Sequence, residues 1–209
     1  MKTRPQIEAL PDLNPTRTTM ENKPHPSYRR ILGAVQSLAA HAQPLSGVWY
    51  RCVETSFAHE IVSGEGARVH GARWNPIGSF RTVYLSGTPE TALEEYLARA
   101  RRMQWPDHRS LPMVMAGVEV NVRRVLDLRA PGAAAVIEPL LKIERAHWRS
   151  TQSRREAMSQ AIGRAARDAG LQGLLAPSQQ VKGGLNLVLF PDKLSRLDRL
   201  SAPKLKMLG

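Results

Sequence analysis

The sequence predicts an α+β fold in which a mixed β-sheet core is flanked by helices. Short apolar runs typical of strands recur along the chain, and longer segments of helical periodicity lie between them. Glycine and proline residues separate these runs, as expected for turns. With 209 residues, the chain has the length of one domain that buries its own core, with terminal segments in addition.

Two segments precede the predicted sheet. Residues 1–26 contain five prolines and no apolar periodicity, so we expect a flexible N-terminal arm. Ser27 is a suitable N-cap, and apolar residues then recur at helical spacing. This pattern predicts a helix within residues 27–46 that Pro44 and Gly47 bring to an end.

The first strand is predicted at residues 48–53, with Arg51 inside it. An arginine among apolar strand neighbours faces either solvent or a cleft, and its position alone favours solvent. The next strand is predicted at residues 82–86. Thr88 is then a good N-cap and Pro89 suits the first helical position, so a helix should follow at once.

The stretch at residues 69–97 sets a cation, an aromatic ring and a carboxylate at equal spacing. Eleven positions separate Arg73 from Tyr84, and another eleven separate Tyr84 from Glu95. Such a set suits an anionic nucleotide whose sugar becomes positively charged. A hairpin and a helix with ordinary surface charges fit the spacing as well. Helical geometry does not choose between Glu95 and its neighbour Glu94.

The second half of the chain alternates strands and helices. A turn is expected at Pro131-Gly132, and the S-x-x-E pattern from Ser153 to Glu156 predicts a capping box that opens a helix ending near Gly170. Strands are expected at residues 112–122, 125–128, 173–176 and 185–190, a further helix at 137–148, a polar loop at 177–186, and a basic C-terminal tail at 192–209.

The composition favours an anionic partner. The chain carries 30 lysine and arginine residues against 18 aspartate and glutamate residues, a formal net charge of +12. The basic residues form scattered pairs, and only 5% of residues are aromatic, which leaves few stacking platforms for single strands. A nucleic-acid-binding or RNA-cleaving protein remains the alternative function, but no known nucleic-acid module supports it, so direct nucleic-acid binding is not expected.

The chain shows no sign of secretion, membrane insertion or metal binding. Cys52 is the only cysteine, which excludes an intramolecular disulfide and fits the reducing cytoplasm. The first 26 residues lack the apolar core of a signal peptide, and no stretch approaches the roughly 18 apolar residues of a membrane span. The six histidines are dispersed, so we expect no metal site.

Several motifs, in this order, resemble the RES-domain family, the toxins of bacterial Xre–RES toxin–antitoxin pairs. They are YRC at 50–52, GARWNP at 71–76, a glycine at 78, VYLSGTPETALEE at 83–95, LLAPS at 174–178 and NLVLFP at 186–191. The resemblance covers roughly residues 47–191, which it identifies as an NAD-binding catalytic domain. One departure is Gly71-Ala72, where the family usually has paired glycines.

The resemblance implies a fold similar to ADP-ribosyltransferase toxins and NAD as substrate. It also implies site residues at Arg51, Arg73, Tyr84, Glu95 and Ser178. The family pattern places its glutamate after an Ala-Leu-x step, which selects Glu95.

Each implied site residue suits one part of NAD chemistry. Arg51 and Arg73 would bind the two phosphates or fix the nicotinamide ribose. Tyr84 would stack on the nicotinamide ring. Glu95 would stabilise positive charge on the ribose as the nicotinamide leaves. Ser178 would hold a ribose hydroxyl or the nicotinamide amide.

The resemblance leaves the ADP-ribose acceptor open. Water, phosphate and a protein side chain all fit, because the same bond of NAD breaks in each case. The basic surface slightly favours a protein acceptor. The resemblance also implies a partner, an antitoxin with an Xre-like DNA-binding region that would block the NAD cleft.

Overall fold

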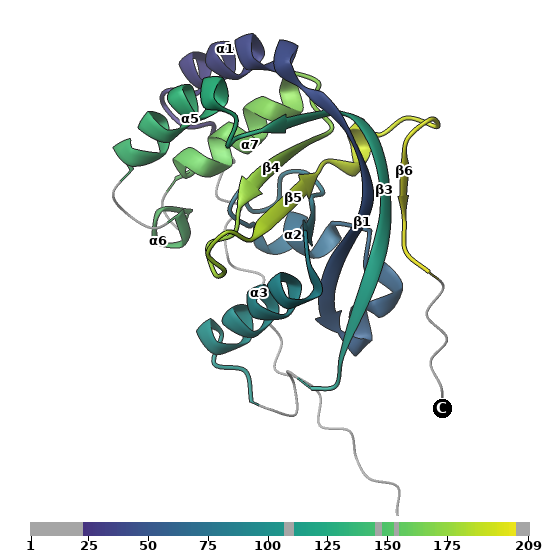
Figure 1. The fold of residues 1–209 in the computed structure, drawn as a ribbon. Coiled ribbons are helices and arrows are strands. Elements are labelled where there is room, and N and C mark those ends of the chain that lie inside the picture. The colour runs from purple at the N-terminus through teal and green to yellow at the C-terminus, as the bar shows by residue number, and fades with distance from the viewer. Residues whose placement is uncertain (1–22, 107–110, 145–147, 153–154, 204–209) are drawn as a thin grey trace, which may run out of the picture.

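The computed structural model describes residues 23–106, 111–144, 148–152 and 155–203, and it confirms the α+β class with a mixed sheet (Figure 1). The strands are β1 (Gln43–Glu54), β2 (Val83–Ser86), β3 (Met113–Asp127), β4 (Gly173–Pro177), β5 (Leu185–Leu189) and β6 (Arg199–Ser201). The helices are α1 (Tyr28–Leu38), α2 (Glu65–His70), α3 (Pro89–Arg102), α5 (Pro131–Ile143), α6 (Trp148–Gln152) and α7 (Met158–Asp168). Short 3₁₀ helices lie at Ala39–His41, Thr55–Glu60 and Pro191–Lys193.

The sheet closes into a barrel-like ring because its first strand, β1, pairs with β3 as well as with β2. The strand order is β1-β2-β5-β4-β3-β6, and β1 also pairs with β3. Most of β3 is antiparallel to β1, whereas its last three residues run parallel to β4. The ring thereby places β2 and β5 side by side, with Ser86 directly opposite Asn186.

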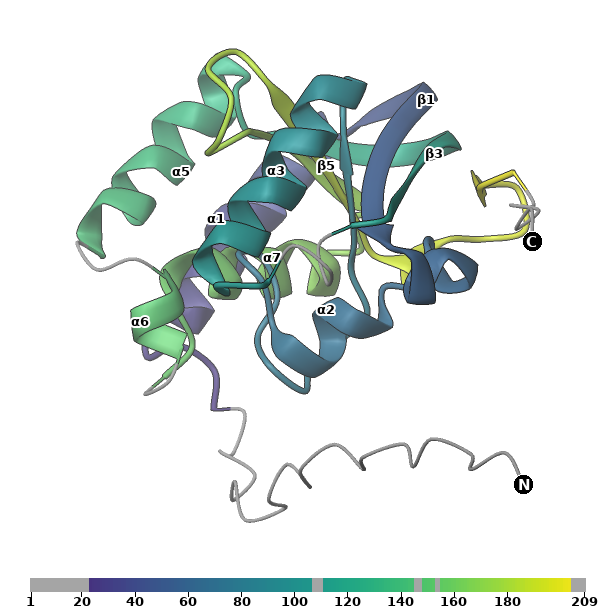
Figure 2. The ribbon, with the colours of Figure 1, turned by 90° about the horizontal axis from the view of Figure 1, so that it is seen from below.

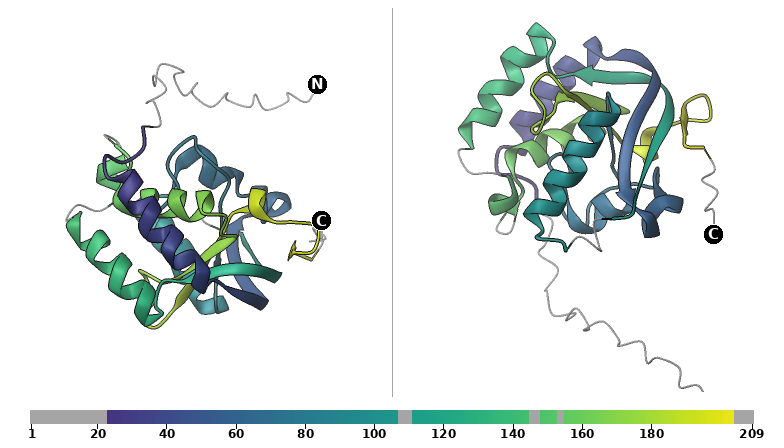
Figure 3. Two further views of the ribbon diagram at one scale, coloured as in Figure 1. Left: turned by 90° about the horizontal axis from the view of Figure 1, so that it is seen from above. Right: turned by 60° about the horizontal axis from the view of Figure 1, so that its bottom comes forward.

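Strand alternation divides the apolar side chains between two cores. In β2 and β5, Val83, Leu85, Leu187 and Leu189 join a core formed by the strands of the ring. Val188 and its neighbours on the other face join a core with helices α1, α5 and α7. These three helices gather at one end of the sheet, as Figure 1 and the left view of Figure 3 show.

Helix α3 lies away from that group, against β1 and β2. Figure 2 shows it crossing the sheet on the side seen from below. Its first turn is built as the sequence predicts: Pro89 is the first helical residue, and the Thr88 hydroxyl accepts a hydrogen bond from the Thr91 N–H at 3.2 Å.

The predicted end of the N-terminal helix is wrong. Helix α1 ends at Leu38, and β1 begins at Gln43 and contains both Pro44 and Gly47. Both residues therefore lie within a strand that pairs with β3, beyond the end of the helix. The pairing register shifts between Gln43 and Leu45, and such an irregularity tolerates a proline.

The predicted N-terminal arm is only partly described, since residues 1–22 lie outside the described part of the chain. The last residues assigned to the arm belong to the folded body. His25 is buried, with 7% of its surface exposed, and its backbone N–H donates to Glu156 Oε2 at 2.6 Å. The arm therefore ends before His25, and not at residue 26.

Several predicted boundaries in the second half also differ. The strands predicted at residues 112–122 and 125–128 form the single strand β3. Pro131 starts α5, where its fixed φ angle suits the first helical position, so the predicted turn there is wrong. Ser153 lies outside the described residues, and α7 starts only at Met158. Glu156 precedes that helix and forms a buried ion pair with Arg164 at 2.7 Å.

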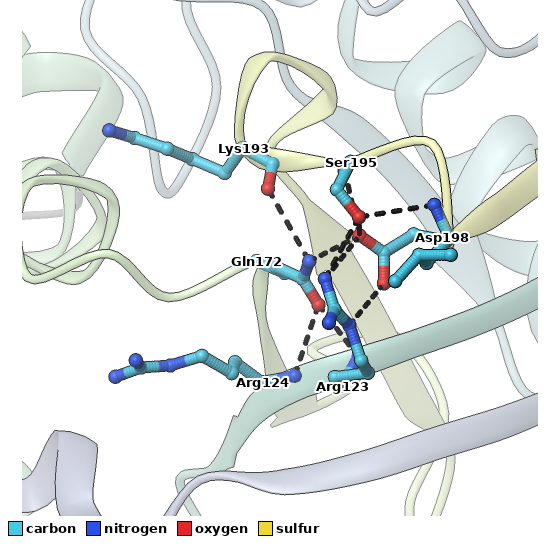
Figure 4. A network of polar contacts seen from close by, with 7 residues as sticks. Arg123, Arg124, Gln172, Lys193, Ser195 and Asp198 are labelled. Carbon is cyan, nitrogen blue, oxygen red and sulfur yellow. Dashed lines mark hydrogen bonds and ion pairs between the residues drawn. The ribbon is translucent and has the colours of Figure 1, made fainter.

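The predicted C-terminal tail adds a strand to the sheet. Strand β6 pairs with the middle of β3, and residues 204–209 lie outside the described part. Figure 4 shows how the segment before β6 is held: Gln172 Oε1 accepts from the backbone N–H of Arg123 at 2.7 Å and of Arg124 at 3.1 Å, and Gln172 Nε2 donates to Asp198 at 2.7 Å. Burial alone would raise the pKa of Asp198, but hydrogen bonds from Arg123, Ser195 and Gln172 lower it to about 2.

Candidate active site

The five predicted site residues come from five separate segments, and the fold brings these segments together. Arg51 lies in β1, Arg73 in the turn after α2, Tyr84 in β2, Glu95 in α3 and Ser178 just after β4. A direct hydrogen bond joins Glu95 to Ser178. Tyr84 lies beside the turn of Arg73, because its hydroxyl accepts a hydrogen bond from the N–H of Trp74, the residue after Arg73. Burial raises the pKa of Tyr84, and the positive charges of Arg73 and Arg51 act against that rise.

Glu95 is held by two hydrogen bonds to one carboxylate oxygen. Its Oε1 accepts from Ser178 Oγ at 2.7 Å and from Asn186 Nδ2 at 2.7 Å. Glu94, in contrast, is about half exposed and forms an ion pair with Arg101 at 3.4 Å on the surface. The fold therefore directs Glu95, and not Glu94, toward β4 and β5.

Ser178 is fixed by its own loop. Its hydroxyl oxygen accepts hydrogen bonds from the backbone N–H groups of Gln180 and Val181, each at 3.1 Å, while its proton is donated to Glu95. Its backbone N–H donates to Gly184 O at 2.8 Å, which closes the loop. This serine hydroxyl is thus both oriented and fully used in hydrogen bonding.

Tyr84 stabilises the turn that carries Arg73 through two hydrogen bonds. Its hydroxyl accepts from the Trp74 N–H at 3.0 Å and donates to Asn75 Oδ1 at 2.9 Å. Asn75 is fully buried, and its Nδ2 donates to Ala67 O at 2.7 Å. Burial raises the pKa of Tyr84 well above its usual value, so the phenol stays neutral and keeps both bonds.

Arg51 points inward, so the solvent-facing position expected from the strand pattern alone is wrong. Its Nη1 donates to Ile61 O at 2.8 Å. Burial, and then the nearby cation of Arg99, lower the pKa of Arg51 to about 10. Among the residues that the structure describes, no carboxylate forms an ion pair with Arg51. A partly buried cation without such a partner attracts an anionic ligand.

Arg73 is similarly placed. Its guanidinium lies 4.9 Å from the ring centre of Trp74, and Nη1 is 3.4 Å from Pro177 O. Burial lowers the pKa of Arg73, while Tyr84 and Glu95 act in the opposite direction. Arg73 also lacks an ion-pair partner within the described part of the chain, so two arginine charges remain for an anion.

Three residues of this region were not predicted from the sequence: Asn75, Ser86 and Asn186. Asn75 holds Tyr84, and Asn186 holds Glu95. Ser86 Oγ donates to Asn186 Oδ1 at 3.0 Å. The alternation of apolar residues in both strands contained a signal, because Ser86 and Asn186 share the face of Tyr84 and Val188. The strand pairing needed to use that signal was not predictable.

Replacing Tyr84 by phenylalanine tests its role in the turn. Tyr84→Phe leaves the Trp74 N–H and Asn75 Oδ1 without this partner in a buried position, so we expect the free energy of unfolding in urea to fall by about 1–3 kcal/mol. Tyr28→Phe is the matched control, because its hydroxyl bonds Asp168 at an exposed position. A larger loss for Tyr28→Phe than for Tyr84→Phe would contradict the assignment.

Other features lie outside this region. A cavity of about 260 Å³ between α1, α5 and the start of α7 is lined by His25, Arg30, Glu144 and Arg155, among others, and by none of the five predicted site residues. Within the described residues, no group of three or more histidine, cysteine, aspartate or glutamate residues is placed to hold a metal ion. None of the described helices is both long and apolar enough to cross a membrane.

The chain belongs to the RES domain family, whose profile matches residues 48–206 and extends beyond the predicted end at residue 191. Among curated proteins, the NAD(+) phosphorylase MbcT of Mycobacterium tuberculosis and of Mycobacterium bovis is 31% identical over 142 residues, which are 66% of this chain and 70% of MbcT. Among solved structures, the crystal structure of the M. tuberculosis MbcT–MbcA toxin–antitoxin complex matches with a TM-score of 0.62. That match has 22% identity and covers 82% of this chain and 88% of the other.

Proposed function

We propose that this protein cleaves the nicotinamide–ribose bond of NAD and transfers the ADP-ribose to an acceptor. One observation carries the proposal: a carboxylate fixed by two hydrogen bonds lies in the same region as two arginines that have no ion-pair partner among the described residues. A dinucleotide supplies the anion, and its ribose supplies the positive charge that develops during cleavage. The name of the 31% identical relative also supports NAD as the substrate.

The proposed roles follow from charge and position. Arg51 and Arg73 bind the two adjoining phosphates, for which a guanidinium offers paired donors. Glu95 stabilises the cationic ribose as the C1′–N bond breaks and the bond electrons leave with neutral nicotinamide. The ring of Tyr84 remains our candidate for stacking on the nicotinamide, since the hydroxyl is engaged with the turn.

We propose inorganic phosphate as the acceptor. A phosphate oxygen then forms a new bond to C1′ of the ribose, which gives a phosphorylated ADP-ribose, nicotinamide and a proton. The name of the relative supports phosphate over the protein acceptor that the basic surface slightly favours. Phosphate also carries the charge that the excess of arginine and lysine attracts.

We further propose that the protein is the toxin of a toxin–antitoxin pair. The solved structure that shares its fold is named as such a complex. An antitoxin that covers the region of Arg73 and Glu95 would keep NAD out. An Xre-like DNA-binding region in that antitoxin is the expectation from the family resemblance.

Incubation of the purified protein with NAD tests the reaction and its acceptor together. NAD carrying separate labels in nicotinamide and in adenine is supplied in a phosphate-free buffer, with or without added phosphate or cell lysate. We expect nicotinamide release that depends on phosphate, and a product heavier than ADP-ribose by one phosphate group. Free ADP-ribose would indicate water as acceptor, adenine label on protein would indicate a protein acceptor, and no nicotinamide release would overturn the proposal.

A further inference from the structure

Asn186 and Ser86 form a polar pair that the proposed reaction has not yet used. They lie directly opposite each other on β5 and β2, in the antiparallel pairing that closes one side of the ring. Ser86 is buried, with 5% of its surface exposed, and its hydroxyl donates to Asn186 Oδ1 at 3.0 Å. The pair therefore has a fixed place in the fold and a fixed direction of hydrogen bonding.

The orientation of the Asn186 amide follows from its two neighbours. Its oxygen accepts from Ser86, and its Nδ2 donates to Glu95 Oε1 at 2.7 Å. The reversed amide would place its oxygen against a carboxylate oxygen, where two acceptors repel each other. The hydrogen bonds to Glu95 and to Ser86 thus require the same orientation of the Asn186 amide.

Both donors to Glu95 use the same oxygen. Ser178 and Asn186 each lie 2.7 Å from Oε1, whereas Oε2 accepts no hydrogen bond from the described residues. A carboxylate that accepts both hydrogen bonds at one oxygen cannot rotate without breaking these two charge-assisted bonds. The second oxygen is then the one presented to a ligand.

We propose that Asn186, oriented by Ser86, is a positioning residue that holds Glu95 with Oε2 toward the ribose of NAD. This inference rests on the proposed function and adds residues to its site. Ser178 is also a positioning residue for Glu95, because its hydroxyl already makes three hydrogen bonds and retains no proton for the substrate. Asn186 and Ser178 act through Glu95, without touching the reacting atoms.

Asn186→Ala tests this role through steady-state kinetics. The variant removes one of two donors to Glu95, so we expect kcat for nicotinamide release to fall about 10- to 100-fold, while KM for NAD stays within about twofold. Asn121→Ala is the matched control, because Asn121 is an exposed asparagine within β3. Circular dichroism and thermal unfolding verify that both variants are folded.

Asn186→Asp tests the role through the pH dependence of activity, which would not change if Asn186 served the fold alone. When protonated, the new carboxyl group has the shape of the asparagine amide and donates to Oε1 in its place. When ionised, it repels Glu95. Two carboxylates in such contact share a proton that is lost only as pH rises, within roughly pH 5 to 8. We therefore expect the activity of N186D relative to the wild type to be highest at low pH and to fall as pH rises, with no such trend for N121D.

The outcomes separate the two proposals. Wild-type turnover together with an N186A kcat within about twofold of the wild type overturns the role of Asn186 alone. An activity ratio of N186D to wild type that does not change with pH would also overturn the role of Asn186 alone. A wild-type protein that releases no nicotinamide overturns the proposed function and, with it, the role of Asn186.

Discussion

Glu95→Gln is expected to lower NAD turnover by at least about 100-fold, the effect typical of deleting a group that stabilises charge in the transition state. Glutamine keeps the size of the side chain, and its carbonyl oxygen can still accept from Ser178 and Asn186. Its amide nitrogen then replaces Oε2 and directs a donor, instead of a negative charge, toward the cationic ribose. Nicotinamide release per enzyme at saturating NAD measures the effect.

Glu94→Gln is the control for this variant. Glu94 is the preceding residue of the same helix, and it forms its ion pair with Arg101 at the surface. We expect its turnover to match the wild type, since exposed ion pairs contribute little. Unchanged turnover in Glu95→Gln, with the fold intact, would remove Glu95 from the reaction and leave the two arginines without a catalytic partner.

Gly163→Ala is expected to destabilise the fold strongly, although it adds only one methyl group. A Cβ at this position in α7 would lie 1.8 Å from the backbone oxygen of Trp74, in the turn that carries Arg73. Neither the helix nor the turn can yield easily, because Trp74 is buried and its N–H is bonded to Tyr84. We expect a loss on the order of 3 kcal/mol, which corresponds to roughly 6–12 °C in Tm.

Gly33→Ala is the matched control for Gly163→Ala. Both glycines lie inside helices, but a Cβ at Gly33 of α1 meets no atom within 4 Å. Alanine there should raise stability by roughly 0.5–1 kcal/mol, because glycine weakens a helix interior. Thermal unfolding of the two variants side by side measures the difference. Equal Tm values would show that α7 does not press on the turn as closely as described.

The local sequence was sufficient to predict those elements whose structure depends on neighbouring residues. Thr88 and Pro89 indicated the start of α3 in advance, and short apolar runs located β2 and β5. Pairing over a long distance decided the rest. Pro44 and Gly47 were expected to end a helix at their own positions. They lie instead within β1, because β3 supplies a partner strand that the local sequence does not reveal.

The same distinction applies to the candidate site. The pattern of the family pointed to five residues, but helix geometry alone did not choose between Glu94 and Glu95. The family pattern selected Glu95, and the structure gives the physical reason: Glu95 bonds Ser178 and Asn186, which lie 83 and 91 positions further along the chain. The strand pattern alone also favoured a solvent-facing Arg51, because the hydrogen bond from Arg51 to Ile61 O cannot be inferred from that pattern.

The sequence distance between Glu95 and its two supports has a consequence for synthesis of the protein. Helix α3 leaves the ribosome well before Ser178 and Asn186 have been translated. The carboxylate is anchored only after β5 has been made and has paired with β2 and β4. Nascent chains that have not yet reached Asn186 therefore lack the anchored carboxylate on which the proposed reaction depends.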